Sequence, residues 1–280
     1  MTKNSEVSEA EIPVHSSSNM LLRELDENGI FRLTLNDHAR RNALSEEMLD
    51  KLAEALSQAE VNSEIRVIII AANGPAFSAG HDLKELTAAR ENGDQGKAYF
   101  SKILAKCSAV MQSIVRHPKP VIAEVTGIAT AAGCQLVASC DLAVAAESAR
   151  FATPGVHIGL FCSTPMVALS RNVSSKHAME MLLTGEMLSA EKAEDVGLIN
   201  MVTSNQDLTK QTMDMAKTIA SKSTMTLAIG KRAFYEQREM SLSDAYTYAS
   251  DVMVENMLKQ DAQEGIRAFL EKRTPEWQDT

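Results

Sequence analysis

Residues 68–86 decide the fold, and they read IIIAANGPAFSAGHDLKEL. The segment 66–71 is almost entirely aliphatic and β-branched, which is typical of a strand buried on both faces. The triplet Asn-Gly-Pro at 73–75 then ends this strand in a turn. Small residues follow at 78–80, and Asp82 can cap the first turn of a helix that begins directly after it. This stretch therefore predicts a buried strand, a small-residue turn and a helix start.

Such a turn can leave backbone N–H groups unpaired and directed at one point, where the helix dipole favours negative charge. That arrangement is the geometry of an oxyanion hole. Small residues and an Asp cap also occur at ordinary strand-to-helix connections of α/β proteins, so the stretch by itself leaves both interpretations open.

A second stretch repeats the pattern. Residues 121–125 read VIAEV and predict another buried strand, and residues 126–136 continue as TGIATAAGCQL. Because residues 131–133 lack bulky side chains, their backbone can approach a ligand closely and direct another N–H at the same carbonyl group. Tight helix packing would also explain these small residues, but two such turns, each after a buried strand, favour a shared site.

Composition restricts the class of protein. The chain has 280 residues, is 45% hydrophobic and carries a net charge of −9, which is enough apolar content for a globular core. The acidic balance, without a block of Lys or Arg, argues against nucleic acid or a membrane surface as a partner. No apolar run approaches the ~20 residues of a membrane span. We therefore expect neither nucleic acid nor membrane among its partners.

The cysteines and the N-terminal segment bear on the compartment. Residues 1–19 are polar and contain no Arg, which is unlike a signal peptide or a basic transit peptide, and we predict a disordered tail there. The cysteines have neither zinc spacing nor the density of a disulfide scaffold, so we predict reduced thiols, no metal site and a cytoplasmic protein. The cysteines are Cys107, Cys134, Cys140 and Cys162.

The rest of the chain divides into an α/β part at 20–204 and a helical part at 205–280. The α/β part opens with a predicted hairpin of strands 20–24 and 30–35, and a helix to about Gln58 follows. The helical part needs a surface for its apolar faces, which a partner subunit or the chain itself could provide. Its predicted helices are 208–221, 225–236, 242–258 and 261–272.

Four motifs in chain order resemble the crotonase, or enoyl-CoA hydratase/isomerase, superfamily. They are FSAGHDL at 77–83, GIA to CQL at 127–136, CDL at 140–142 and FATP at 151–154. The resemblance extends over about residues 20–273. It implies an α/β fold, a crotonase-type spiral of repeated ββα units with a C-terminal helical trimerisation region, and homotrimers that often pair into hexamers. It also implies an acyl-CoA thioester as ligand, with coenzyme A as part of the substrate, no bound cofactor and no metal.

The resemblance assigns the thioester carbonyl to the backbone N–H groups of His81 and Ala132. Loss of one such donor typically costs ~3 kcal/mol, so both turns must keep their geometry. It places Arg40 and Arg41 over the CoA phosphates, and Phe234 near the CoA pocket, although the spacing of Phe234 is also typical of a core residue. The substrate contacts it implies are Arg40, Arg41, Ala43, Ala79, Gly80, His81, Asp82, Leu83, Ile128, Ala132, Pro154, Ile158 and Phe234.

The departures from the family pattern concern catalysis. Hydratases of this family use two glutamates that share one water, whereas this chain has Gln135 and Gly155 at those positions. Neither residue can exchange a proton at neutral pH. Because each acid–base group typically contributes ~10²–10⁴-fold, we expect hydration to be weak or absent, and isomerisation loses the same contribution.

Other side chains could carry the proton instead. His157, Cys162 and Ser163 follow Gly155 on the loop expected to line the acyl pocket, and the ring of His81 could point inward. A histidine in a loop is equally compatible with a structural hydrogen bond, and Cys134 and Cys162 with packed apolar positions.

Three functions remain open from the sequence. The first is an enoyl-CoA hydratase/isomerase family enzyme with altered chemistry, such as thioester hydrolysis or decarboxylation. The second is a non-catalytic acyl-CoA-binding or assembly subunit. The third, an RNA-binding member of the superfamily, is disfavoured by the acidic charge.

Overall fold

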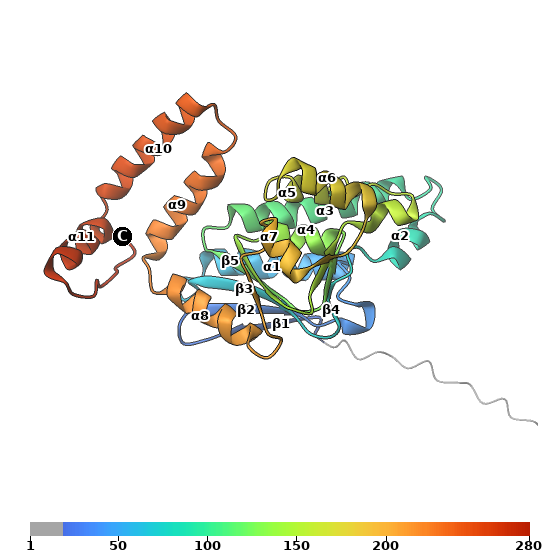
Figure 1. Cartoon of the computed structure of the whole chain (residues 1–280), viewed down its shortest axis with the longest axis horizontal. Coiled ribbons are helices and arrows are strands. Elements are labelled where there is room, and N and C mark those ends of the chain that lie inside the picture. Colours follow the sequence, from blue (N-terminus) through green and yellow to red (C-terminus); the bar gives the residue numbers. More distant parts are fainter. Residues whose placement is uncertain (1–18) are drawn as a thin grey trace, which may run out of the picture.

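The computed structural model describes residues 19–280, so the predicted disordered tail lies outside the described residues except for Asn19. A six-stranded sheet forms the base of the core, in the order β1-β2-β3-β5-β7-β10 (Figure 1). The β1–β2 pair is the predicted antiparallel hairpin, and every later pair is parallel. The strands are β1 (Leu21–Leu25), β2 (Ile30–Leu35), β3 (Val67–Ala72), β5 (Val121–Val125), β7 (Leu142–Ala146) and β10 (Met201–Thr203).

A second, four-stranded sheet stands beside the first, in the order β4-β6-β8-β9. Its strands are β4 (Ala76–Ser78), β6 (Ile128–Thr130), β8 (Arg150–Ala152) and β9 (Leu188–Ser189). Each long strand β3, β5 and β7 leads within a few residues into a short strand of this sheet, and a helix follows. This is the repeated ββα unit that the resemblance implied. The sequence did not predict β4 and β6 as strands, because segments of three residues that pair only across the fold are too short to show a local periodicity.

Strand β3 is buried on both faces, as its aliphatic sequence predicted. Ile68 and Ile70 belong to the main core cluster under α1 (Glu46–Val61) and α3 (Lys97–Arg116). Val67 and Ile69 face the opposite way, into a smaller cluster with Ala216 of α8 (Leu208–Ala220). In Figure 1, α8 covers one face of the large sheet while α1, α3 and α4 (Ala132–Ser139) lie over the other.

Short helices replace part of the predicted loops. The loop expected after Gly155 contains the end of η2 (Pro154–Ile158) and leads into α5 (Pro165–Leu169), and each of these helices has a proline in its first turn. The remaining short elements are η1 (His38–Arg40), α2 (Leu83–Ala89), α6 (Ser175–Thr184) and α7 (Ala190–Asp195). No helix of residues 19–280 is long and apolar enough to cross a bilayer.

The helices α9 (Thr224–Gln237), α10 (Leu242–Met257) and α11 (Gln260–Glu271) stand away from the core (Figure 1). A partly buried ion pair anchors α9, because Lys231 Nζ lies 2.6 Å from Asp141 Oδ2 and donates to the carbonyl oxygen of Ile114 at 3.0 Å. The hydroxyl of Tyr235 donates to the second oxygen of Asp141 at 2.9 Å.

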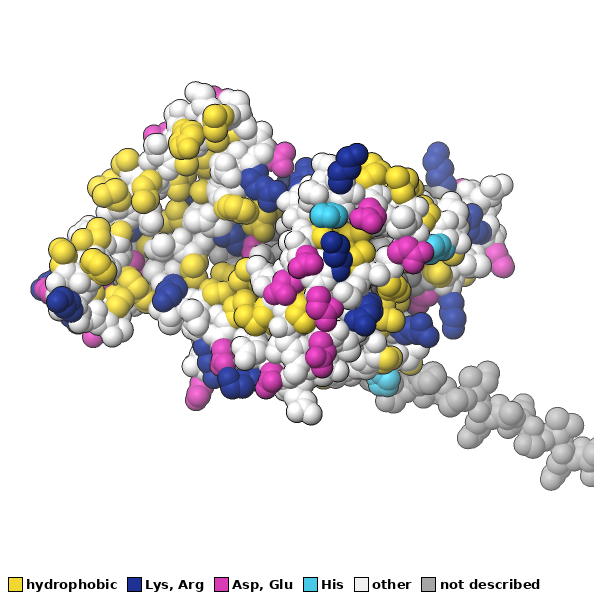
Figure 2. Space-filling view, viewed as in Figure 1, with side chains coloured by type: hydrophobic (Ala, Val, Ile, Leu, Met, Phe, Trp, Pro, Cys, Tyr) yellow, Lys and Arg dark blue, Asp and Glu magenta, His cyan; other side chains and the backbone are white. Residues whose placement is uncertain are grey.

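The helices α10 and α11 expose a large apolar surface, which Figure 2 shows as hydrophobic side chains gathered on this part of the molecule. Soluble monomers rarely expose so much contiguous apolar surface, which supports the expectation of a partner for these helices. Five large side chains are between 70% and 82% exposed, and they are Leu242, Tyr246, Leu258, Phe269 and Leu270.

Candidate active site

Three strand ends meet at one edge of the small sheet. Strands β4, β6 and β8 are parallel neighbours, with Ser78 paired to Ala129 and Thr130 paired to Ala152. Because parallel strands present their carboxyl ends at the same edge, the segments 79–82, 131–135 and 153–155 lie together there. Two of these segments are the turns that the sequence singled out, and the third includes Gly155.

Gly80 brings the first two turns into contact. It has φ +90°, and a Cβ atom added to it would lie 3.0 Å from the Cβ of Ala131 and 3.2 Å from the amide nitrogen of Ala132. Gly133 is similarly restricted, since a Cβ there would lie 2.2 Å from the carbonyl oxygen of Ser78. Only glycine permits this approach of α4 to the end of β4.

The amides of these turns fall into two groups. Ala79 N–H donates to the carbonyl oxygen of Arg41 at 3.0 Å, Gly80 N–H to Ser78 Oγ at 3.3 Å, and Ala131 N–H to the carbonyl oxygen of Ala152 at 2.9 Å. Within residues 19–280, the amides of His81 and Ala132 have no hydrogen-bond acceptor. The two amides expected to hold a carbonyl oxygen are therefore both free, as are the amides of Asp82, Gly133 and Cys134 in the same segments.

Ala131 adopts an unusual backbone conformation at this edge, with φ 50° and ψ −118°. A residue with a Cβ atom in a region that favours glycine costs about 1–3 kcal/mol, and such strain concentrates at functional sites. Its N–H is bonded to Ala152, and its carbonyl oxygen accepts from Gln135 N–H at 3.0 Å. These two hydrogen bonds, to Ala152 and from Gln135, thus fix the peptide plane that carries the Ala132 N–H.

Three buried side-chain atoms without hydrogen-bond partners belong to the same edge. They are His81 Nε2, Gln135 Oε1 and Thr153 Oγ1, from three separate segments. Buried polar atoms are nearly always bonded to protein or to ordered water, so three unpaired atoms on segments that meet at one edge indicate a site for a polar ligand or a bound water. The sequence did not single out Thr153, although it lies within the FATP motif.

The His81 ring is fixed by the neighbouring loop. Its Nδ1 lies 3.3 Å from the carbonyl oxygen of Leu44. Burial lowers the pKa of His81, while Leu44 and Glu85 oppose that shift. Because the ordinary pKa of histidine is already near 6.5, the imidazole is neutral at neutral pH.

Arg40 and Arg41, in the segment between β2 and α1, differ in their partners. The Arg40 guanidinium is 2.6 Å from Asp37 and 3.3 Å from Asp82, which also caps α2 by accepting from Lys84 N–H at 2.8 Å. Arg41 is exposed with φ 53°, and it forms no ion pair with another residue of the described part of the chain. Arg41 is therefore the arginine whose charge is available to a ligand.

Asn42 is a residue of this loop that the sequence analysis missed. It is fully buried, and its side-chain amide donates to the carbonyl oxygens of Asn73 at 2.9 Å and Ala76 at 2.8 Å. It thereby holds the loop against the turn before β4. Ala43, beside it, is 5% exposed.

Gly155 has no room for a side chain. A Cβ atom there would lie 2.7 Å from the carbonyl oxygen of Leu160 and 2.9 Å from Cys162 Sγ. The loop after η2 thus fills the space next to Gly155, where the resemblance implies the second glutamate. Gln135, at the first position, is 5% exposed on fully buried α4.

The alternative proton carriers are placed differently from His81. His157 is exposed, and its Nε2 lies 3.3 Å from the carbonyl oxygen of Gly185 at the end of α6. Ser163 is exposed and donates to the carbonyl oxygen of Phe161 at 3.3 Å. Cys134 and Cys162 are buried, as expected for packed positions, and burial raises the pKa of the Cys134 thiol to about 12.

Three of the predicted apolar substrate contacts outside the two turns are exposed, and so is Ala79 within the first turn. Leu83 is 53%, Ile158 60% and Phe234 54% exposed, while Ile128 and Pro154 are half-buried. The interpretation of Phe234 as a core residue is therefore wrong. Its ring packs edge-on against Tyr235 at 5.2 Å, and the Arg238 guanidinium lies over it at 5.5 Å.

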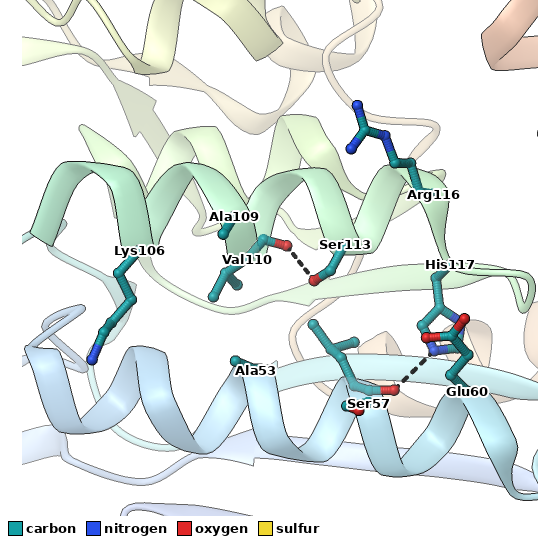
Figure 3. Close-up of a pocket in the computed structure, with 10 residues that line it drawn as sticks. Ala53, Ser57, Glu60, Lys106, Ala109, Val110, Ser113, Arg116 and His117 are labelled. Carbon is teal, nitrogen blue, oxygen red and sulfur yellow. Dashed lines mark hydrogen bonds between the residues drawn. The ribbon is translucent and has the colours of Figure 1, made fainter. Parts of the chain in front are cut away.

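A groove of about 300 Å³ between α1 and α3 is separate from this edge and includes none of the predicted site residues. Figure 3 shows Lys106 at one end and His117 with Glu60 at the other, with Ala53, Ala109 and Val110 between them. His117 Nε2 lies 3.1 Å from the carbonyl oxygen of Leu56, in the last turns of α1. This histidine therefore makes structural hydrogen bonds, since its Nδ1 also accepts from Lys119 N–H at 3.1 Å, and neither ring nitrogen is left for a ligand in the groove.

Comparison with known proteins identifies the family. The model of the enoyl-CoA hydratase/isomerase family matches residues 26–280. The chain belongs to the enoyl-CoA hydratase/isomerase family. Among relatives, it is 51% identical over 251 residues to "Enoyl-CoA hydratase domain-containing protein 3, mitochondrial" of Mus musculus, covering 90% of this chain and 82% of that protein.

Solved structures of the family share its fold. The enoyl-CoA hydratase of Mycobacterium smegmatis is 49% identical, with a TM-score of 0.88 over 93% of this chain and 99% of that one. Human enoyl-CoA hydratase domain-containing protein 3 is 47% identical, with a TM-score of 0.87 over 92% and 100%. The crotonase-type α/β fold is thereby confirmed.

The relatives also correct the predicted compartment. The expectation of a cytoplasmic protein is contradicted, because the relatives named domain-containing protein 3 from rat, mouse, human, Xenopus laevis and Danio rerio are all described as mitochondrial. The cysteine pattern misled the prediction, since a mitochondrial protein can equally hold reduced, buried thiols.

Proposed function

We propose that this enoyl-CoA hydratase/isomerase family member binds an acyl-CoA thioester with its carbonyl oxygen between the amides of His81 and Ala132. The supporting observation is that these two amides, on turns in contact at Gly80, have no acceptor within residues 19–280. Each donor of such a pair is typically worth ~3 kcal/mol of transition-state stabilisation. The strained Ala131 backbone is consistent with a preorganised site.

The reaction proposed for this site does not depend on two carboxylates. Gln135 cannot titrate, and the space beside Gly155 is filled by Leu160 and Cys162, so hydration is expected to be weak or absent. Thioester hydrolysis and decarboxylation both place negative charge on the carbonyl oxygen. The two amides would stabilise that charge in either reaction.

The coenzyme A part of the substrate would be held by charge and by the outer contacts. Arg41 is the exposed, unpaired guanidinium of the described loop, and a guanidinium suits phosphate oxygens. Arg40 is already balanced by Asp37 and Asp82, so its contribution would be to hold the loop. A homotrimer or hexamer would cover the exposed apolar side chains of α10 and α11.

A non-catalytic acyl-CoA-binding or assembly subunit is the alternative. It is favoured by the absence of a titratable side chain at both positions 135 and 155 of the described chain. Such a protein would bind the thioester and release it unchanged.

Calorimetric titration with butyryl-CoA and with free CoA, beside an assay of crotonyl-CoA hydration, tests the proposal. We expect butyryl-CoA to bind more tightly than CoA, and hydration to be near background. Equal binding of the two ligands would refute the carbonyl site, and rapid hydration that Gln135→Ala abolishes would refute the loss of acid–base chemistry.

A further inference from the structure

The protonation of the His81 ring follows from its partner. A carbonyl oxygen can only accept, so the contact between His81 Nδ1 and the Leu44 carbonyl oxygen assigns the hydrogen to Nδ1. The other nitrogen, Nε2, then carries a lone pair. It is buried and has no partner within residues 19–280, so this lone pair is free to accept a proton.

The charges around the ring leave it neutral. Glu85, on α2, is the charged group that acts on the ring, and its carboxylate already accepts from Tyr99 Oη at 2.9 Å and from Glu46 N–H at 3.0 Å. The adjacent Asp82 is paired with Arg40. Burial outweighs these effects and lowers the pKa of His81, so the ring is in its basic form at neutral pH.

Gln135 and Thr153 supply the other polar groups at this place. Their backbone segments are joined to the first turn through Ala131, since Gln135 N–H donates to the Ala131 carbonyl oxygen and Ala131 N–H donates to the carbonyl oxygen of Ala152, the residue before Thr153. Gly80, the residue before His81, packs against Ala131. A water that donates to Nε2 and to Gln135 Oε1, and accepts from the Thr153 hydroxyl, would satisfy all three atoms.

We propose that His81 is the general base of a thioester hydrolysis at this site, in which its Nε2 takes a proton from a water held by Gln135 and Thr153. This inference rests on the proposed function, because the backbone N–H of the same residue binds the carbonyl oxygen of the thioester. The base and one of the two amides that bind the carbonyl oxygen therefore belong to the same residue.

The step is balanced without a further reactant. The water oxygen bonds the thioester carbon while its proton moves to Nε2, and the amides of His81 and Ala132 hold the resulting oxyanion. The carbon–sulfur bond then breaks, and the proton passes from Nε2 to the leaving sulfur. The products are a carboxylic acid and coenzyme A.

Release of CoA thiol from butyryl-CoA by the full-length protein tests the inference. His81→Ala keeps the backbone N–H but removes the base, and His81→Asn keeps a donor for Leu44 in case the alanine variant is unstable. His177→Ala is the matched control, because this histidine lies on α6, outside the site, and within residues 19–280 its ring hydrogen-bonds only Ser174, with Nδ1 3.2 Å from Oγ. We expect both His81 variants to lose about 10²–10⁴-fold in kcat while still binding a non-hydrolysable thioether analogue, and the control to keep its activity.

The pH profile separates a base from a structural residue. In the wild type, kcat/KM should fall with decreasing pH below the ordinary histidine pKa, and this limb should be missing from the residual activity of His81→Asn. Hydrolysis by His81→Asn at the wild-type rate, or a wild type that binds the analogue but releases no thiol above the buffer rate, would overturn the role of His81. Failure of the wild type to bind the analogue would instead overturn the proposed function.

Discussion

Restoring a carboxylate at position 135 should create proton-transfer chemistry without restoring hydration. Gln135→Glu changes little in volume, and the Gln135 Oε1 that it replaces is buried without a partner. The new carboxyl group would have no cationic neighbour on fully buried α4, so desolvation should raise its pKa above the usual value for glutamate. A carboxylate with a raised pKa is a stronger base than an ordinary glutamate, and it would stand on the helix that carries the Ala132 amide.

Removal of the α-proton of an acyl-CoA needs only one base and an oxyanion hole. We therefore expect Gln135→Glu to accelerate exchange of the α-hydrogens of butyryl-CoA in deuterated water by about 10²–10⁴-fold, the usual contribution of one such group. Proton NMR of the acyl chain would measure it. Gln135→Leu, which has a similar volume and no carboxyl group, is the matched control.

Hydration of crotonyl-CoA should not follow, because it needs the second group. A glutamate at position 155 would place its Cβ 2.7 Å from the Leu160 carbonyl oxygen and 2.9 Å from Cys162 Sγ, a degree of overpacking that typically costs ~1–3 kcal/mol. The double variant Gln135→Glu, Gly155→Glu should therefore be less stable and still hydrate poorly. Efficient hydration by the double variant, or no acceleration of exchange by Gln135→Glu with acyl-CoA binding intact, would refute this reasoning.

Three further perturbations test other parts of the structure. Gly80→Ala should weaken butyryl-CoA binding in calorimetry and destabilise the protein by about 1–3 kcal/mol. The reason is that residue 80 has φ +90° and its new Cβ would press on the Ala132 amide. Gly93→Ala is the control and should have neither effect, because a Cβ there meets nothing within 4 Å. Acidification below the ordinary histidine pKa should lower the free energy of unfolding measured by urea titration. Burial lowers the pKa of both His81 and His117, so the unfolded chain binds more protons than the folded one at such pH. An increase in stability on acidification would contradict this. Phe269→Glu and Leu270→Glu should reduce the mass measured by light scattering to that of a monomer, while Val61→Glu, which alters a comparably exposed residue (84%) at the end of α1, should not.

The sequence by itself determined the elements that depend on chain neighbours. The aliphatic run of β3, the cap at Asp82 and the two small-residue turns are local patterns, and the four ordered motifs identified the family. That Gln135 and Gly155 stand where the resemblance implies two glutamates is likewise a matter of residue identity, which needs no structure.

The tertiary structure decided which of these residues can act. The short strands β4 and β6 bring the two turns together, and that pairing joins residues about fifty positions apart, beyond the reach of any local pattern. The same holds for the contact of His81 with Leu44, which frees Nε2, and for that of His157 with Gly185, which occupies its ring. Whether an amide, a ring nitrogen or a guanidinium is free depends on its partners across the fold, and those partners are set by packing.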